Sequence, residues 1–317
     1  MKKQIYKIII AGFLAFAFLN IICFFYYNVP PRVNDIDNST DYKWPSKAFY
    51  SSATEGVACG KMNNDGYNNL LEYNDNLSID SLVMGGSHLE GRNINQEDNM
   101  VAVLNSLSSD YYYNIGISEH TLPICISNLE NAIAKYKPKK YVIIETMNIG
   151  FADSELNRFL NQREKLPTYS GGLMDILQNM KYLKLIRYQL VDTDLSYQTE
   201  SVLNEDLLDQ MLQKASNICD ENNLKLIIVF HSNFTVSNNK EIVFNYNEND
   251  CKIFEEVCKN NDIIFINMKQ DFINEYKINN IIPYGFDNSV IGYGHLNKYG
   301  HKIIANRIKE EIGNDSK

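Results

Sequence analysis

Hydrophobic residues gather in two kinds of run along the chain. The first kind is one stretch of twenty residues without a charge, from Ile8 to Tyr27. A helix rises about 1.5 Å per residue, so roughly 20 apolar residues cross the ~30 Å hydrocarbon core of a bilayer. The pattern therefore predicts one membrane-spanning helix near the N-terminus.

The second kind of run is short and recurs five times after residue 79. The runs are SLVMG (81–85), YYYNIGI (111–117), KYVIIET (140–146), KLIIVF (225–230) and DIIFINM (262–268). Their β-branched and aromatic content is typical of strands, and their continuous apolar character indicates burial on both faces. Helical patterns lie between them, so strand and helix alternate. We predict an α/β fold, a three-layer α/β/α sandwich around a five-stranded parallel sheet.

The pattern divides the chain into three parts. Residues 1–27 are expected to form a cytoplasmic tip and the membrane anchor, residues 28–78 a stalk and lead-in, and residues 79–317 the α/β domain. The middle part is rich in Asn, Asp, Ser, Gly and Pro and lacks a sustained apolar period until it becomes a packed lead-in near Trp44. The stretch of about 150–203 is longer than one crossover needs, which predicts a helical insertion near the site.

The charged residues are distributed unevenly on the two sides of the apolar run. Lys2, Lys3 and Lys7 precede the apolar run, and the rest of the chain carries 27 of the 30 basic residues and all 39 acidic ones, a balance of −12. The positive-inside rule then places the N-terminus in the cytoplasm and the C-terminal domain outside the cell membrane. A cleaved signal peptide is the alternative, although the run is long for one and no A-x-A-like site follows. The acidic balance argues against a nucleic-acid partner.

Five cysteines follow the anchor, at irregular spacing and without a C-x-x-C pair. This is neither a disulfide framework nor a zinc-binding pattern, so we expect no metal site and no cofactor.

Small polar residues follow each predicted strand. In an open parallel sheet, ligands bind beyond the carboxyl ends of the strands, so these residues are the first candidates for chemistry. They are Gly85-Gly86-Ser87-His88-Leu89-Glu90-Gly91, Asn114-Ile115-Gly116-Ile117-Ser118-Glu119-His120, Glu145-Thr146-Met147-Asn148, His231, and Gly294-His295-Leu296-Asn297 before the last helix.

This arrangement resembles the SGNH hydrolase superfamily, also called GDSL-like esterases, in which four blocks supply Ser, Gly, Asn and His. The resemblance covers roughly residues 79–312, and the run HLNKYGH (295–301) looks like the family's H-L-N-x-x-G-H. It implies that Ser87 is the nucleophile and His295 the general base. It also implies an oxyanion hole formed by the backbone N–H groups of Ser87 and Gly116 and the amide of Asn148.

The chemistry agrees with those roles. A serine hydroxyl is a weak nucleophile until an imidazole takes its proton, and the same imidazole can later protonate a leaving alcohol. Donors fixed around the developing oxyanion stabilise the transition state. The structural alternatives are that the glycines only form tight turns, that Asn148 caps a helix, and that His295 is a surface or capping residue.

Two positions depart from the family pattern. The usual acid lies three residues before the histidine, where this chain has Gly292, and Gly86 replaces the Asp of G-D-S. Either a Ser–His dyad suffices, or Asp287, Glu90 or Glu119 orients His295. Some members of the superfamily look like this chain in having G-x-S-H in the first block.

Three more histidines, His88, His120 and His231, follow strands and are predicted to contact the substrate or support the site. A zinc cluster with His295 is the less favoured interpretation. His301 is expected to pack or to cap a helix.

These features predict a membrane-anchored extracytoplasmic serine esterase or O-acyltransferase, with acetyl the favoured acyl group. Its expected substrates are cell-envelope glycans or lipid-linked saccharides, and envelope-assembly proteins are further possible partners. The alternative hypothesis is a catalytically inactive protein of the same fold that binds glycans or partner proteins during surface-polysaccharide assembly.

Overall fold

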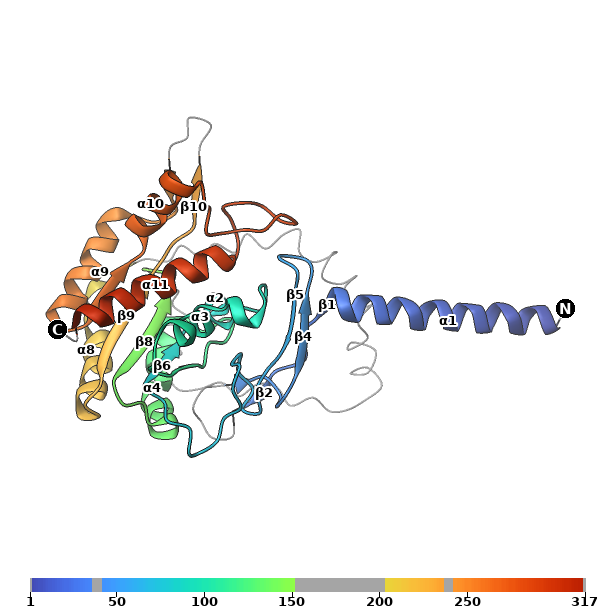
Figure 1. Cartoon of the computed structure of the whole chain (residues 1–317), viewed down its shortest axis with the longest axis horizontal. Coiled ribbons are helices and arrows are strands. Elements are labelled where there is room, and N and C mark those ends of the chain that lie inside the picture. The colour runs from blue at the N-terminus through green and yellow to red at the C-terminus, as the bar shows by residue number, and fades with distance from the viewer. Residues whose placement is uncertain (1, 36–41, 152–202, 237–241, 316–317) are drawn as a thin grey trace.

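The computed structural model describes residues 2–35, 42–151, 203–236 and 242–315 (Figure 1). The helical insertion predicted for about residues 150–203 lies almost entirely outside the described residues.

The five predicted strands form one parallel sheet. They are β6 (Ser81–Met84), β7 (Tyr112–Asn114), β8 (Tyr141–Thr146), β9 (Lys225–Phe230) and β12 (Ile264–Asn267). Their spatial order is β12-β9-β8-β6-β7, and every neighbouring pair is parallel. The predicted fold class is therefore confirmed. The chain order reverses between β6 and β8, and such a switch point is where open α/β sheets bind ligands.

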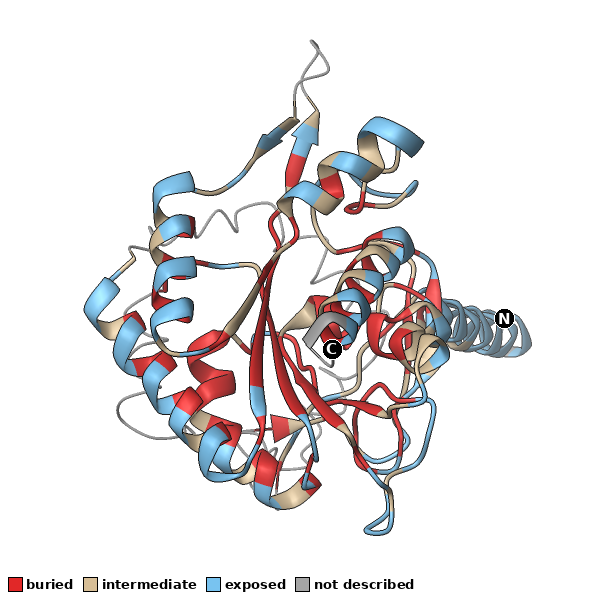
Figure 2. Ribbon diagram, turned by 60° about the vertical axis from the view of Figure 1, so that its left-hand side comes forward, coloured by how far each residue is buried: buried red, intermediate tan, exposed pale blue. Residues whose placement is uncertain are grey.

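Helices cover both faces of this sheet (Figure 2). One layer contains α4 (Leu122–Tyr136), α8 (Glu205–Glu221) and α9 (Glu248–Asn260), and the other contains α3 (Met100–Leu107), α10 (Lys269–Asn279) and α11 (Lys298–Asp315). Successive strand residues point to opposite faces, so Leu82 joins the core of the first layer and Val83 that of the second. Both faces are apolar, which explains the continuous hydrophobic runs of the strands.

An exposed apolar helix, α1 (Lys2–Tyr26), precedes this domain and projects from it (Figure 1). Its Ile8 and Phe13 side chains are 72% and 69% exposed. Among the described residues, α1 is the one helix long and apolar enough to cross a membrane.

A small antiparallel region joins α1 to the α/β domain. Its strands are β1 (Tyr27–Asn28), β2 (Val33–Asn34), β3 (Tyr42–Lys43), β4 (Phe49–Ser52) and β5 (Ala58–Lys61). A three-stranded sheet has the order β1-β4-β5, so the chain leaving α1 pairs at once with β4. Trp44, Tyr50 and Met62 form a buried cluster of their own. A further hairpin, β10 (Phe234–Val236) with β11 (Ile242–Phe244), follows β9.

Candidate active site

Ser87 lies at the carboxyl end of β6, beside the switch point of the sheet. The chain turns through Gly85 and Gly86, and Ser87 is the first residue of the short helix α2 (Ser87–Glu90). A side chain at Gly85 would bring its Cβ within 2.5 Å of Glu145 Oε2, so only glycine fits there. The tight turn therefore presents the hydroxyl of Ser87 at the sheet edge.

His295 reaches Ser87 from the loop between α10 and α11. Its Nε2 lies 3.0 Å from Ser87 Oγ, a hydrogen-bond distance across 208 residues of sequence. Sequence analysis predicted that these two residues act together, and the structure places them in contact.

Glu55 orients His295. Its Oε2 lies 2.7 Å from His295 Nδ1, and its Oε1 accepts the backbone N–H of the same histidine at 2.5 Å. Partial burial would raise the pKa of Glu55, but its hydrogen bonds and charge interaction with His295 outweigh burial and hold the pKa below the usual value. An ionised Glu55 accepts a hydrogen bond from the Nδ1–H of His295. The Nε2 atom is then unprotonated and can accept a hydrogen bond from the Ser87 hydroxyl. Ser87, His295 and Glu55 thus form a triad.

Two glycines explain why the acid comes from the other end of the chain. Gly292, where the family pattern has its acid, adopts φ +87°, a conformation strained for residues with a side chain. Gly294 has φ +88°, and a Cβ there would lie 2.1 Å from Glu55 Oε1. The loop before His295 therefore leaves space for a carboxylate that arrives from elsewhere.

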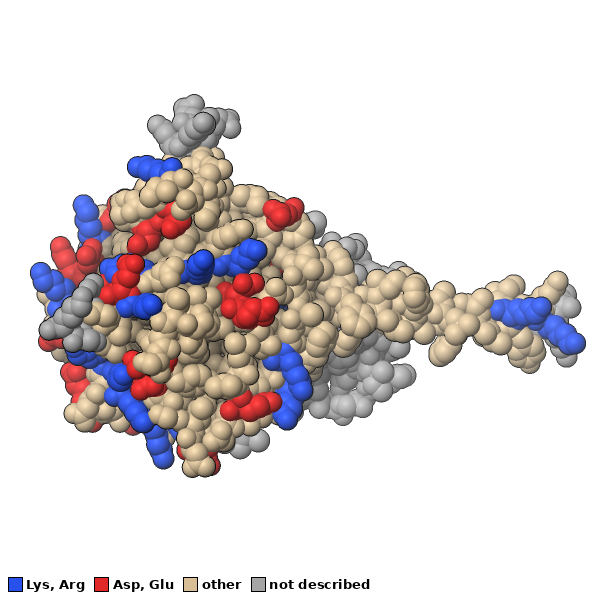
Figure 3. All heavy atoms as spheres, in the orientation of Figure 1, with Lys and Arg blue, Asp and Glu red and all other residues tan. Residues whose placement is uncertain are grey.

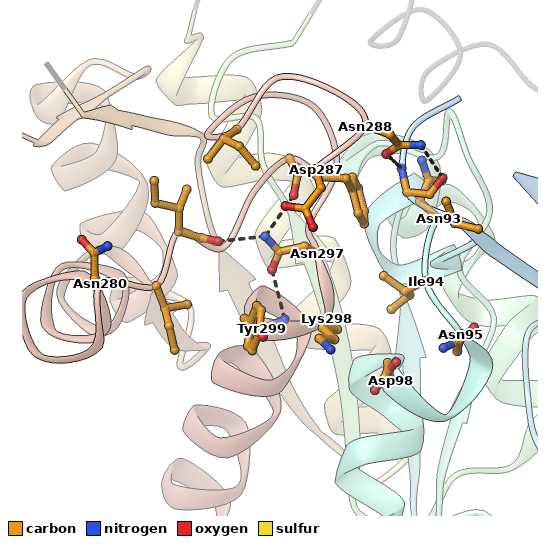
Figure 4. Close-up of a pocket in the computed structure, with 17 residues that line it drawn as sticks. Asn93, Ile94, Asn95, Asp98, Asn280, Asp287, Asn288, Asn297, Lys298 and Tyr299 are labelled. Carbon is orange, nitrogen blue, oxygen red and sulfur yellow. Dashed lines mark hydrogen bonds between the residues drawn. The ribbon is translucent and has the colours of Figure 1, made fainter. Parts of the chain in front are cut away.

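The turn that carries Glu55, between β4 and β5, is held by two asparagines. Asn288 accepts the N–H of Gly56 at 2.9 Å and donates to the carbonyls of Ala53 and Gly56, both at 3.0 Å (Figure 4). Asn93 adds a bond of 3.0 Å to the Glu55 carbonyl. Because Asn288 belongs to the His295 loop, it fixes Glu55 relative to the histidine.

The His295 loop is braced in turn by Asn297. Its amide nitrogen donates to the carbonyls of Ile282 and Gly285, and its oxygen accepts from the first amides of α11, at Tyr299 and Gly300 (Figure 4). These bonds explain the asparagine of the H-L-N motif, since it ties the loop ends together and caps the helix.

A second histidine–carboxylate pair lies buried beneath the serine turn. Glu145 accepts from the Gly86 N–H at 3.1 Å through Oε2, and its Oε1 lies 2.5 Å from His231 Nε2. Tyr284 Oη lies 2.5 Å from His231 Nδ1. Burial, and to a smaller extent the charge of Glu145, keep the pKa of Tyr284 well above its usual value, so the phenol donates to His231. We call Tyr284, His231 and Glu145 the buried network.

His88 packs between the histidines of the two histidine–carboxylate pairs. The centroid of its ring lies 5.0 Å from that of His231 and 5.2 Å from that of His295. Its Nδ1 accepts the Leu296 N–H at 3.1 Å, and its Nε2 lies 3.0 Å from Met147 Sδ. Burial lowers the pKa of His88 well below the usual value, and the neighbouring histidines lower it further. His88 is thus a neutral packing residue with Nε2 protonated.

The acids proposed from sequence have other partners. Glu90 is buried and binds Arg92 Nε at 2.6 Å, with further bonds from Trp44 and Ser118. Glu119 accepts from Arg32 at 3.1 Å. Asp287 lines a pocket of about 740 Å³ together with Asn288 and Asn297 of the same loop (Figure 4). The partner of His295 Nδ1 is Glu55 instead.

The predicted oxyanion donors differ in their surroundings. Ser87 opens α2, so its N–H has no acceptor within the helix. Asn148 is exposed two residues beyond β8, at the same sheet edge. The N–H of Gly116, however, donates to Asn114 Oδ1 at 2.7 Å, and the glycine packs against Leu89 and Glu90. In the structure the Gly116 N–H is therefore already bonded to the side chain of Asn114 and is not free to donate to an oxyanion.

The remaining histidines have structural environments. The His120 ring packs edge-on against Tyr42, and its carbonyl lies beneath Gly86. His301 Nδ1 accepts the Met100 N–H at 3.1 Å and so caps α3, and burial lowers its pKa to about 3. Within the described ranges, no group of three or more His, Cys, Asp or Glu side chains is placed to hold a metal ion.

Two important carboxylates were given no role from the sequence, although Glu145 was among the residues noted at the strand ends. Glu145 carried a usable signal, since a charged residue inside the apolar run KYVIIET must have a buried partner. Glu55 carried none, because ATEG reads as an ordinary turn between two short strands and nothing in its spacing points to His295.

No protein-family model matches the sequence, and no curated protein sequence is significantly similar to it. Solved structures similar in shape include an esterase from Pseudoalteromonas, at 14% identity over 74% of this chain and 97% of the other, TM-score 0.40. A lipolytic G-D-S-L family protein from Veillonella parvula matches at 14% over 74% and 97%, TM-score 0.40, and a GDSL-like lipase from Bacteroides thetaiotaomicron at 13% over 74% and 88%, TM-score 0.38. The functional proposal below therefore rests on the geometry of Ser87, His295 and Glu55.

Proposed function

We propose that this protein is a membrane-anchored serine esterase or O-acyltransferase that acts on cell-envelope glycans through an acyl-Ser87 intermediate. The observation that carries the proposal is the continuous hydrogen-bonded row of Ser87, His295 and Glu55.

The geometry supports a two-step reaction. Ser87 Oγ attacks the ester carbonyl carbon while its proton passes to His295 Nε2, and Glu55 stabilises the imidazolium through Nδ1–H. The bond to the sugar oxygen then breaks, and that oxygen takes the proton from Nε2. Water or an acceptor hydroxyl next attacks the acyl group with His295 again as base, and Ser87 regains its proton. The Ser87 N–H and the Asn148 amide are the oxyanion donors that this proposal uses.

The anchor is retained in this proposal. The C-terminal end of α1 makes contacts that a cleaved leader would not need: Ser51 Oγ donates to the Phe24 carbonyl at 2.7 Å, and the Phe24 and Phe49 rings stack at 5.3 Å. Lys2, Lys3 and Lys7 at the start of α1 support an orientation with the N-terminus in the cytoplasm and the α/β domain outside the cell.

A serine-directed fluorophosphonate probe tests the proposal on the purified full-length protein. We expect labelling and aryl acetate turnover, both lost in Ser87→Ala and both kept in Ser106→Ala, whose serine is exposed on α3. An unlabelled, inactive wild type would contradict the enzyme. Product analysis with and without a glycan acceptor then separates transfer from hydrolysis.

One observation favours a second candidate, an inactive glycan- or partner-binding protein of the same fold. The Gly116 amide is bound to Asn114 and does not complete the predicted oxyanion hole. If this candidate holds, glycan binding persists in Ser87→Ala while wild type shows neither labelling nor turnover.

A further inference from the structure

The strand that leads to the catalytic acid is bonded directly to the membrane helix. Tyr27 and Asn28, the residues that follow α1, pair with Ser52 and Ser51 of β4. Asn28 Nδ2 also donates to the Phe49 carbonyl at 2.6 Å. The end of α1 and the base of the Glu55 turn are therefore one structural unit.

This connection limits how far the triad can lie from the membrane. Paired Cα atoms in an antiparallel ladder are about 5 Å apart, and the three residues from Ser52 to Glu55 span at most about 11 Å. Glu55 thus lies within about 16 Å of Tyr27, at the end of the membrane span. Figure 1 shows the loop between α10 and α11, which carries His295, extending toward β4 and β5 on the side from which α1 leaves.

Exposed apolar side chains lie close in sequence to Glu55 and His295 on these two loops. Val57 is 76% exposed, Val290 65%, Ile291 50% and Tyr293 61%. We call these four residues the apolar rim. Between Asn288 and Asn297 the loop contains no charged residue, and Glu55 is the one charged residue between Ser51 and Val57.

The helix that leads to these loops carries no charged residue from Ile8 to Tyr26. In Figure 3, charged side chains lie over the body and at the N-terminal tip of α1, while uncharged residues cover the helix between them. Exposed apolar side chains beside a membrane anchor are suited to contact with the membrane, because the anchor holds them close to it.

We propose that the apolar rim rests in the headgroup layer of the membrane that α1 spans, so that the triad acts on an ester or acceptor carried by a membrane-embedded lipid. This inference rests on the proposed function and names its substrate class, a lipid-linked glycan. A long polymer free in solution would have to enter between the rim and the bilayer.

Tryptophan quenching tests where the rim lies. Trp44 is the only tryptophan and is buried, so its signal is a constant background. We expect full-length Tyr293→Trp in phosphatidylethanolamine–phosphatidylglycerol vesicles to lose at least about half of its added fluorescence when the acyl chains are brominated. Ile278→Trp, on the exposed end of α10, is the matched control and is expected to lose little. Equal quenching of the two variants would overturn the proposal.

A charge in the rim tests the substrate class. We expect Val290→Asp to lower the rate on an acylated glycolipid embedded in the same vesicles about tenfold relative to its rate on a water-soluble aryl acetate, and Ile278→Asp to leave that ratio unchanged. An unchanged ratio in Val290→Asp would contradict a lipid-borne substrate. If aryl acetate turnover and fluorophosphonate labelling are absent in wild type, the esterase proposal fails, while the quenching result still decides where the rim lies.

Discussion

The described residues contain two histidine–carboxylate pairs with the ring of His88 between their histidines, and the two pairs have different roles. Glu55 and His295 are partly exposed and lie 2.7 Å apart, with Ser87 at the far nitrogen of the ring. Glu145 and His231 are buried and lie 2.5 Å apart, with Tyr284 at the far nitrogen. The chemistry of the pair is the same in both. The two pairs differ in solvent exposure and in the third residue. The exposed pair has a serine within reach of solvent, which makes that serine a candidate nucleophile. The buried pair has a phenol with a raised pKa, which suits a structural role beneath the serine turn.

The largest expected effect is on the exposed side. We expect His295→Ala to lower aryl ester turnover by about 10⁴- to 10⁶-fold, because it removes the proton acceptor of Ser87. Its urea unfolding midpoint should stay close to that of wild type, since the ring is partly solvated. Turnover reduced less than about tenfold would show that Ser87 has another base.

Glu55→Gln tests the orienting carboxylate. We expect a loss of about 10²- to 10⁴-fold in kcat, because an amide favours the wrong histidine tautomer and leaves the imidazolium without its counter-charge. Asp287→Asn, at one of the acids first proposed from sequence, is the control and should retain full activity. Full activity in Glu55→Gln together with a loss in Asp287→Asn would show that Asp287, and not Glu55, orients His295.

The buried network should respond in stability instead. Glu145→Gln removes the buried carboxylate that accepts hydrogen bonds from His231 Nε2–H and from the Gly86 N–H, so we expect a loss of about 1–3 kcal/mol in the free energy of unfolding by urea titration. Its kcat at a temperature where it is folded should fall less than that of Glu55→Gln. A larger fall would make Glu145 part of the reaction rather than of the support.

Gly294→Ala probes the space between Glu55 and the His295 loop. The new Cβ would overlap Glu55 Oε1 and strain a positive φ, so we expect a fall in kcat of about 10-fold to 100-fold. The double variant Gly294→Ala with Glu55→Gln should be hardly worse than Glu55→Gln alone, because both act through the same contact. Additive losses would place the effect of Gly294 elsewhere.

The smallest expected effect is a pH dependence from the buried histidines. The pKa of His301 is about 3 in the folded protein against about 6.5 unfolded, so between these values the unfolded state binds the extra proton and stability falls with acidification. We expect this residue to cost about 2 kcal/mol on going from pH 7 to pH 5. The pKa of Glu55 is lowered, so its contribution persists at pH 5 and is lost only as the pH falls through its folded value. Urea titrations at both pH values should show that the free energy of unfolding of His301→Gln falls less between pH 7 and pH 5 than that of wild type. An equal fall in the two proteins would contradict this role of His301.

The fold was readable because burial of a parallel sheet on both faces leaves continuous apolar runs, and all five runs became strands. The contact of Ser87 with His295 was implied by the resemblance to SGNH hydrolases, whose first and last blocks this chain matches at SH (87–88) and HLNKYGH (295–301). Glu55 was not readable, because its contact spans 240 residues and depends on the absence of a side chain at Gly294. Gly116 was expected to offer a free amide, but a neighbouring side chain, Asn114, occupies it, and such local competition leaves no trace in motif spacing.

The 240-residue separation of Glu55 and His295 also has a consequence for how the protein is made. Chains emerge from synthesis N-terminus first, so Glu55 is made long before its partner exists. Asn288 and His295, which lock its turn, are made almost last. A C-terminally truncated chain therefore has Ser87 and Glu55 without His295, and the triad is complete only when nearly the whole polypeptide has been synthesised.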